Sequence, residues 1–109
     1  SEHVAKAVAK AEKTGVIPSL MIDCSHGNSS KDPERQPAVL QNVMQQVTDG
    51  NRHIHSVMME SNLKAGNQKM PANLEELEYG VSITDGCLDW ATTEKALRDS
   101  HAALASRIS

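Results

Sequence analysis

Apolar residues recur with a helical period in three segments of the chain. Near the start, Val4, Val8 and Ala11 are spaced by four and three residues, and Gly15 follows where a helix would end. Two later segments repeat the pattern, with core-facing positions at Val39, Leu40, Val43, Met44, Val47, Leu97, His101, Leu104 and Ile108. The spacing predicts helices near residues 2–14, 36–49 and 92–107.

Three short apolar runs have the length of β-strands, near residues 19–23, 54–59 and 81–84. A carboxylate closes each run: Asp23 ends the first, Glu60 follows the second and Asp85 follows the third. The first run has the continuous apolar character of a strand buried on both faces. The intervening stretches are rich in turn-forming residues and predict loops, the longer one with a short helical turn near residues 74–77.

Strands that alternate with helices predict a parallel α/β sheet joined by right-handed crossovers. Each strand-plus-helix unit of a (β/α)₈ barrel takes roughly 30 residues of a total near 250. The 109 residues of this chain therefore match about three such units and a leading helix. A small, complete α/β domain stays open as an alternative. Its core would be marginal, because the chain has one Trp, one Tyr and no Phe.

Composition and charge argue against several classes of protein. Eleven basic and fourteen acidic residues give a net charge of -3, without the basic cluster that nucleic-acid binding needs. The apolar runs are far shorter than the roughly 20 residues of a membrane span, and no secretory signal is visible. We therefore expect no nucleic acid and no membrane as partner, and the cytoplasm as compartment. Cys24 and Cys87 form no CxxC pair and are expected to be reduced, buried thiols.

The carboxylates after the three strands are the first candidates for chemistry. In parallel α/β folds, ligand and catalytic groups gather at the carboxyl ends of the strands. Asp23, Glu60 and Asp85 all take that position, and His26 lies in the loop after Asp23. A lone carboxylate there is usually a turn or capping residue. A histidine with carboxylates from separate loops, however, suits a divalent ion such as Mn²⁺, Fe²⁺ or Zn²⁺.

Other residues that could bind a metal have structural explanations. His53 and His55 project to one face of the second strand, but they lie at its beginning and on the face opposite to Glu60. We therefore expect a structural role for both. Cys24 and Cys87 flank candidate residues, and we expect them to pack in the interior and not to act as nucleophiles.

Several motifs occur in an order that resembles a known family. The loop from Asp23 to Lys31 reads DCSHGNSSK, residues 58–63 read MMESNL, residues 66–68 read GNQ, and residues 80–90 read GVSITDGCLDW. Together they resemble the C-terminal part of the type I 3-deoxy-D-arabino-heptulosonate 7-phosphate synthases, and the fungal forms above all. The likeness runs from about Ser1 to Arg107.

This resemblance implies a (β/α)₈ barrel of the shikimate pathway, on the route to the aromatic amino acids. Family members are transferases that condense phosphoenolpyruvate with erythrose 4-phosphate and release phosphate. They hold a divalent metal, such as Mn, Fe, Co or Zn, with a Cys, a His, a Glu and an Asp. The motifs match the last three ligands to His26, Glu60 and Asp85. His26 and Asp85 are implied to be catalytic, beside the substrates, in a loop region shaped by Asn28, Ser29 and Lys31.

The resemblance also implies an incomplete site. The family's metal-binding Cys, and the Arg and Lys residues that hold the phosphates, come from earlier strands and have no counterpart here. We therefore expect residues 1–109 to be a single segment, the C-terminal portion of the synthase barrel, that supplies three metal ligands and is inactive alone. We expect it to form a homo-oligomer or to associate with the missing barrel part. The alternative is a non-catalytic structural or interaction module derived from the barrel.

Overall fold

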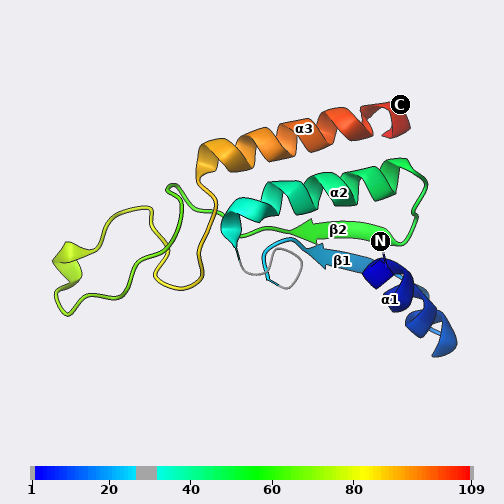
Figure 1. Ribbon diagram of the computed structural model, residues 1–109, viewed down its shortest axis with the longest axis horizontal. Helices are drawn as coiled ribbons and strands as arrows, with labels where there is room; N and C mark the ends of the chain where they lie inside the picture. Colours follow the sequence, from blue (N-terminus) through cyan, green and yellow to red (C-terminus); the bar gives the residue numbers. More distant parts are fainter. Residues whose placement is uncertain (1, 27–31, 109) are drawn as a thin grey trace.

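A computed structural model of the chain describes residues 2–26 and 32–108 and shows a mixed α/β arrangement (Figure 1). The described elements are α1 (Glu2–Lys13), β1 (Leu20–Asp23), the 3₁₀-helix η2 (Pro33–Arg35), α2 (Gln36–Thr48), β2 (Ile54–Met58), the 3₁₀-helix η3 (Leu74–Glu76) and α3 (Trp90–Ile108). The three predicted helices are confirmed, as are the first two strands and the short helical turn. In the described part of the chain, no helix is both long enough and apolar enough to cross a membrane.

The two strands lie parallel, as the alternation of strands and helices predicts. Leu20 pairs with Ile54 and Asp23 with Met58, and the register shifts once just after Leu20. Both strands point towards the same end of the molecule, and α2 and α3 run back beside them (Figure 1). The carboxyl ends of β1 and β2 therefore lie at the same edge of the sheet.

The third predicted strand, near residues 81–84, does not form, and that prediction is wrong. Ser82 makes only an isolated parallel bridge, and its partner is Asn67 in the long loop after β2. The chain pairs with the segment just after β2 only later, where Leu88 bridges Ser61. The apolar content of the run indicates a strand, but it does not specify a partner. This run finds one in the long loop, where a single bridge does not extend into a ladder.

The apolar core lies between the sheet and the helices. Val4 of α1, Val43 of α2 and Ile54 of β2 are buried together. A second cluster joins Leu40 of α2 to Ala96 of α3 and to the residue that follows β1, Cys24. All three helices thus contribute to the same side of β1 and β2. Leu40 is fully buried and packs with Cys24 and Ala96, so the helical layer supports the chain where β1 ends.

Within residues 2–26 and 32–108, no helix packs on the opposite side of the sheet. Met21, in the middle of β1, exposes 60% of its surface, so the expectation of a strand buried on both faces is wrong for the described residues. The radius of gyration is 16.6 Å, against about 13 Å for a compact domain of this length. Much of the excess comes from the loop between β2 and α3, which projects beyond the strand ends (Figure 1).

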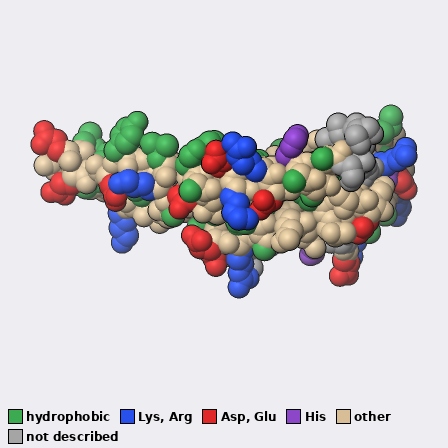
Figure 2. All heavy atoms as spheres, turned by 90° about the horizontal axis from the view of Figure 1, so that it is seen from above, with side chains coloured by type: hydrophobic (Ala, Val, Ile, Leu, Met, Phe, Trp, Pro, Cys, Tyr) green, Lys and Arg blue, Asp and Glu red, His purple; other side chains and the backbone are tan. Residues whose placement is uncertain are grey.

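Hydrophobic side chains stand out from this projecting loop beside acidic ones (Figure 2). They include Leu63, Met70, Leu74 and Tyr79, each more than half exposed. Isolated exposed apolar residues are ordinary on protein surfaces, but several on one loop and an uncovered sheet face are unusual for a self-contained domain. In the described residues, the fold is therefore a two-stranded sheet with helices packed on one face and with the other face open.

Candidate metal centre

Three side chains from three separate segments come together at the carboxyl ends of the strands. His26 follows β1, Glu60 follows β2, and Asp85 lies in the segment before α3. The Nε2 atom of His26 is 3.2 Å from Asp85 Oδ2 and 3.7 Å from Glu60 Oε1. One ligand atom from each residue can be chosen so that all lie within 4.8 Å of one another. The structure thus brings together the three residues that the motif resemblance implies as ligands, whereas the strand ends also indicate Asp23.

The turn after β1 sets the direction of the His26 ring. Asp23 Oδ1 accepts hydrogen bonds from the Ser25 backbone N–H (2.8 Å) and from the Ser25 hydroxyl (2.6 Å). The other oxygen of Asp23 lies 2.8 Å from His26 Nδ1. Because a carboxylate can only accept, Nδ1 carries the proton of this bond. The Nε2 atom is thereby directed at Glu60 and Asp85, so Asp23 orients His26 and is not grouped with the three candidate ligands.

The main chain of Glu60 is held by its neighbours. Its backbone N–H donates to Gln36 Oε1 (2.8 Å), and its carbonyl oxygen accepts from Gln36 Nε2 (3.0 Å) and from the Leu88 backbone N–H (3.0 Å). The Glu60 side chain is 24% exposed, whereas that of Asp85 is 66% exposed. The centre therefore has an inner carboxylate on a fixed backbone and an outer carboxylate that faces solvent.

The charges around His26 are unbalanced towards the acidic side. The hydrogen bond to Asp23, followed by the one to Asp85 and by the nearby negative charges, raises the pKa of His26 above its ordinary value. The hydrogen bond from the Ser25 hydroxyl, helped by the one from His26, holds the pKa of Asp23 well below its usual range. Three carboxylates thus surround one imidazole, an arrangement that favours either a proton or a metal cation.

Replacing Asp23 by asparagine is expected to lower the pKa of His26. The amide removes the charge and the strongest acceptor that stabilise the imidazolium, so the ring loses its proton at lower pH. An NMR titration of the His26 Cε1 proton measures this shift. Asp89→Asn is the matched control, since Asp89 also caps a backbone N–H, that of Thr92. A His26 pKa that stays the same in Asp23→Asn would contradict the assignment.

The other residues considered as candidates are not among the three grouped ligands. His55 Nδ1 is hydrogen-bonded to the Ser19 hydroxyl (2.7 Å) beside the start of β1, at the far end of the strands, as expected for a structural residue. Cys24 and Cys87 are free and buried, as predicted. Burial, and the charge of Asp23, raise the pKa of the Cys24 thiol to about 11, which argues against a nucleophile. Asn28, Ser29 and Lys31 lie outside the described residues.

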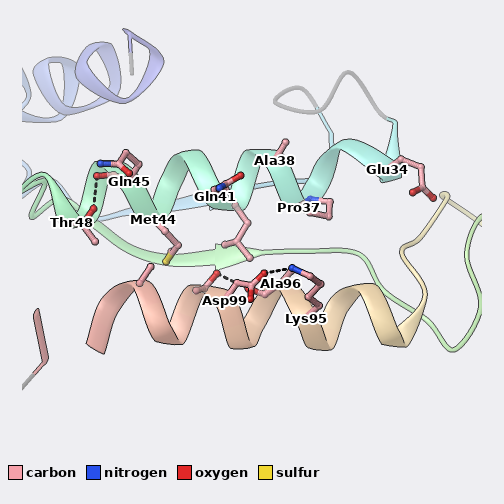
Figure 3. A pocket seen from close by; sticks show the side chains of 13 residues that line it. Glu34, Pro37, Ala38, Gln41, Met44, Gln45, Thr48, Lys95, Ala96 and Asp99 are labelled. Atoms are coloured by element: carbon pink, nitrogen blue, oxygen red, sulfur yellow. Dashed lines mark hydrogen bonds and ion pairs between the residues drawn. The ribbon is translucent and has the colours of Figure 1, made fainter. Parts of the chain in front are cut away.

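A groove of about 530 Å³ also runs between α2 and α3 (Figure 3). Its lining includes Leu40, Met44 and Ala96, and Lys95 and Asp99 form an ion pair along its side. None of the three candidate ligands lines it. The groove belongs to the outer helical layer, away from the carboxyl ends of the strands where the centre lies.

The donor set fits a divalent transition metal. One imidazole nitrogen and two carboxylate oxygens are ligands that Mn²⁺, Fe²⁺, Co²⁺ and Zn²⁺ accept in proteins. Three protein ligands leave further coordination positions for another side chain, water or substrate. The hydrogen bond from His26 Nδ1 to a carboxylate is the outer-shell contact that metal-binding histidines usually make.

The sequence did not reveal the roles of two residues that shape the centre, Asp23 and Gln36. Asp23 is counted among the strand-end carboxylates, but its orienting contact depends on the turn that Ser25 closes. Gln36 gives no signal in the sequence beyond a polar residue where a helix begins, beside Pro37. Both act through side-chain geometry that no spacing pattern reveals.

Comparisons with known proteins agree on one family. The model of the DAHP synthetase I family matches residues 1–98. The Tyr-sensitive phospho-2-dehydro-3-deoxyheptonate aldolase of Escherichia coli is 50% identical over 98 residues, which are 90% of this chain and 28% of that protein. A phospho-2-dehydro-3-deoxyheptonate aldolase of Alternaria alternata is 48% identical over 108 residues, 98% of this chain and 29% of that protein.

A solved structure gives the same result. The phospho-2-dehydro-3-deoxyheptonate aldolase of Francisella tularensis superimposes with a TM-score of 0.88 at 43% identity, over 98% of this chain and 30% of that one. The chain spans about 30% of the length of the curated relatives it matches. The motif resemblance is thereby confirmed, and the chain belongs to the DAHP synthetase I family.

Proposed function

We propose that this chain is the C-terminal, metal-binding part of a 3-deoxy-D-arabino-heptulosonate 7-phosphate synthase. The complete enzyme would condense phosphoenolpyruvate with erythrose 4-phosphate and release phosphate, in the cytoplasm. The observation that carries the proposal is the convergence of His26, Glu60 and Asp85 at the strand ends, in a chain of this family. In this proposal, residues 1–109 form a single segment, the C-terminal portion of one barrel domain.

The open side of the sheet supports a partial (β/α)₈ barrel. In such a barrel, helices cover the outer face of a parallel sheet and the inner face closes on the other strands. Here the helices pack on one face only, and Met21 is exposed on the other. Strand edges with unpaired N–H and C=O groups also favour further pairing. We therefore include association with the rest of a barrel, or with further copies of the chain, in the proposal.

Each residue of the centre has a distinct part in the proposed chemistry. His26 would bind the ion through Nε2, while Asp23 holds the proton at Nδ1 and keeps the ring in that direction. Glu60 would be the inner carboxylate ligand, and Asp85, the more exposed one, would lie nearest to the substrates. The bound metal would supply Lewis-acid polarisation of the sugar aldehyde. We assign catalytic roles to His26 and Asp85, and loop-shaping roles to Asn28, Ser29 and Lys31.

A chimera tests this function directly. The matching 98-residue segment of the Escherichia coli relative is replaced by the corresponding residues of this chain. We expect Mn²⁺-dependent release of phosphate from phosphoenolpyruvate when erythrose 4-phosphate is present. Glu60→Ala should abolish this activity, whereas Glu76→Ala, an exposed glutamate of η3, should preserve it.

The alternative is a non-catalytic module, which the exposed apolar residues of the projecting loop would suit. A chimera that folds and assembles like the parent enzyme, measured by circular dichroism and light scattering, but shows no turnover would favour the module. Activity that survives Glu60→Ala would remove Glu60 from the proposed centre.

A further inference from the structure

We propose that Gln36 is a positioning residue that sets Glu60 at the metal centre. The inference rests on the proposed function, because it takes Glu60 as a metal ligand. Gln36 is the first residue of α2 and is fully buried, with 0% of its surface exposed. A long polar side chain is rarely placed in such an environment unless its amide has partners.

Both partners of the Gln36 amide belong to one residue. Its Oε1 accepts from the Glu60 N–H at 2.8 Å, and its Nε2 donates to the Glu60 carbonyl at 3.0 Å. This two-way pairing of an amide with one residue's N–H and C=O imitates the contact of a neighbouring strand. The pairing of β1 with β2 ends at Met58, so the amide supports the main chain of Glu60 where the sheet no longer does.

The Leu88 N–H donates to the same Glu60 carbonyl at 3.0 Å. The Glu60 backbone is therefore held from α2 on one side and from the segment before α3 on the other. With its main chain fixed, only the side-chain torsions of Glu60 are left to aim the carboxylate. Gln36 therefore supports Glu60 from the first residue of α2.

Only glutamine satisfies this geometry fully. Methionine has a similar length and shape but offers neither a strong donor nor a strong acceptor. Glutamate keeps an acceptor for the Glu60 N–H but, when ionised, loses the donor and sets a carboxylate oxygen against a carbonyl oxygen. Partners that orient a metal ligand without touching the metal usually contribute about 10–100-fold to metal affinity.

Mn²⁺ binding by the whole chain tests the inference, with free Mn²⁺ measured by electron paramagnetic resonance. We expect Gln36→Met to weaken binding about tenfold, and Gln41→Met, an exposed position on the same helix, to leave it unchanged. In a Glu60→Ala background, Gln36→Met should cause no further loss of affinity. These two substitutions form a double-mutant cycle of four proteins: the wild type, each single variant and the double variant. Urea unfolding of all four measures the stability that Gln36→Met costs, which should be similar with and without Glu60. A residue that affects the metal only through Glu60 should lower Mn²⁺ affinity only when Glu60 is present, while its effect on the free energy of unfolding is the same in both backgrounds.

Two results would overturn the inference: unchanged Mn²⁺ affinity in Gln36→Met, or an equal loss in both backgrounds. If Glu60→Ala alone leaves Mn²⁺ affinity unchanged, the proposed metal centre fails as well, so the two failures are distinguishable. Gln36→Glu covers the case in which the methionine variant does not fold. Its added negative charge by itself favours cation binding, so weaker binding supports positioning and equal or tighter binding contradicts it. Hydrogen exchange at the Glu60 amide, slow in the wild type and fast in Gln36→Met, checks the contact without metal.

Discussion

The purified 109-residue chain, supplied with Mn²⁺, phosphoenolpyruvate and erythrose 4-phosphate, is expected to be slower than a complete synthase by a factor on the order of 10⁴ or more. Losses of this size follow when groups that act as a unit are separated from one another. The centre offers three ligands on a sheet whose second face is open. The motif resemblance implies that the family's phosphate-holding cations and its fourth metal ligand come from earlier strands, which residues 1–109 do not match.

A coupled assay of phosphate release measures this rate, and the Escherichia coli relative serves as the positive control under the same conditions. Turnover by the isolated chain within tenfold of that control would contradict the expectation. It would mean that substrate binding needs nothing beyond residues 1–109, and the incomplete-site interpretation would have to be abandoned.

Glu60→Ala is expected to weaken Mn²⁺ binding to the isolated chain by at least about 100-fold, the upper end of what the loss of an outer-shell partner costs. Glu60 is the less exposed of the two candidate carboxylates, so its negative charge is the less screened by solvent. Without it, His26 and Asp85 alone are left, a set of two ligands that binds Mn²⁺ poorly.

Isothermal titration calorimetry at fixed pH measures the affinity. Glu76→Ala is the control, since it removes the same charge from an exposed position on η3. If the two variants lose affinity equally, the effect belongs to net charge and not to the centre. The non-catalytic module also predicts no difference between wild type and Glu60→Ala.

The helices and the first two strands follow from the sequence because their signals are local. Val4 and Val8 share one helical face whatever lies opposite, and Leu20–Asp23 is apolar enough to enter a sheet. The run at 81–84 has a similar composition but pairs with the loop residue Asn67. The partner of a strand is a non-local property, so the pattern of the run itself could not predict it.

The candidate centre was predictable for a related reason. Topology brings His26 and Glu60 together, because each follows the carboxyl end of a parallel strand. Asp85 joins them from the segment before α3, although no strand forms at residues 81–84. The orienting contact of Asp23 and the backbone support from Gln36 depend instead on side-chain torsions and on distances near 3 Å. Sequence spacing resolves which loop a residue occupies, but not which atom it faces.

The three candidate ligands lie far apart along the chain, and this ties metal binding to folding. His26 and Asp85 are 59 residues apart in sequence. In an unfolded chain, bringing two such points together costs roughly 3–4 kcal/mol of loop entropy. In the folded chain the ligands are already close together, so an ion binds the folded state more tightly than the unfolded one and stabilises it. Each tenfold rise in free metal above its dissociation constant then adds about 1.4 kcal/mol to the free energy of unfolding. A substitution that leaves a measurable fraction of the chain unfolded should therefore also lower the apparent metal affinity, even when it lies far from the strand ends.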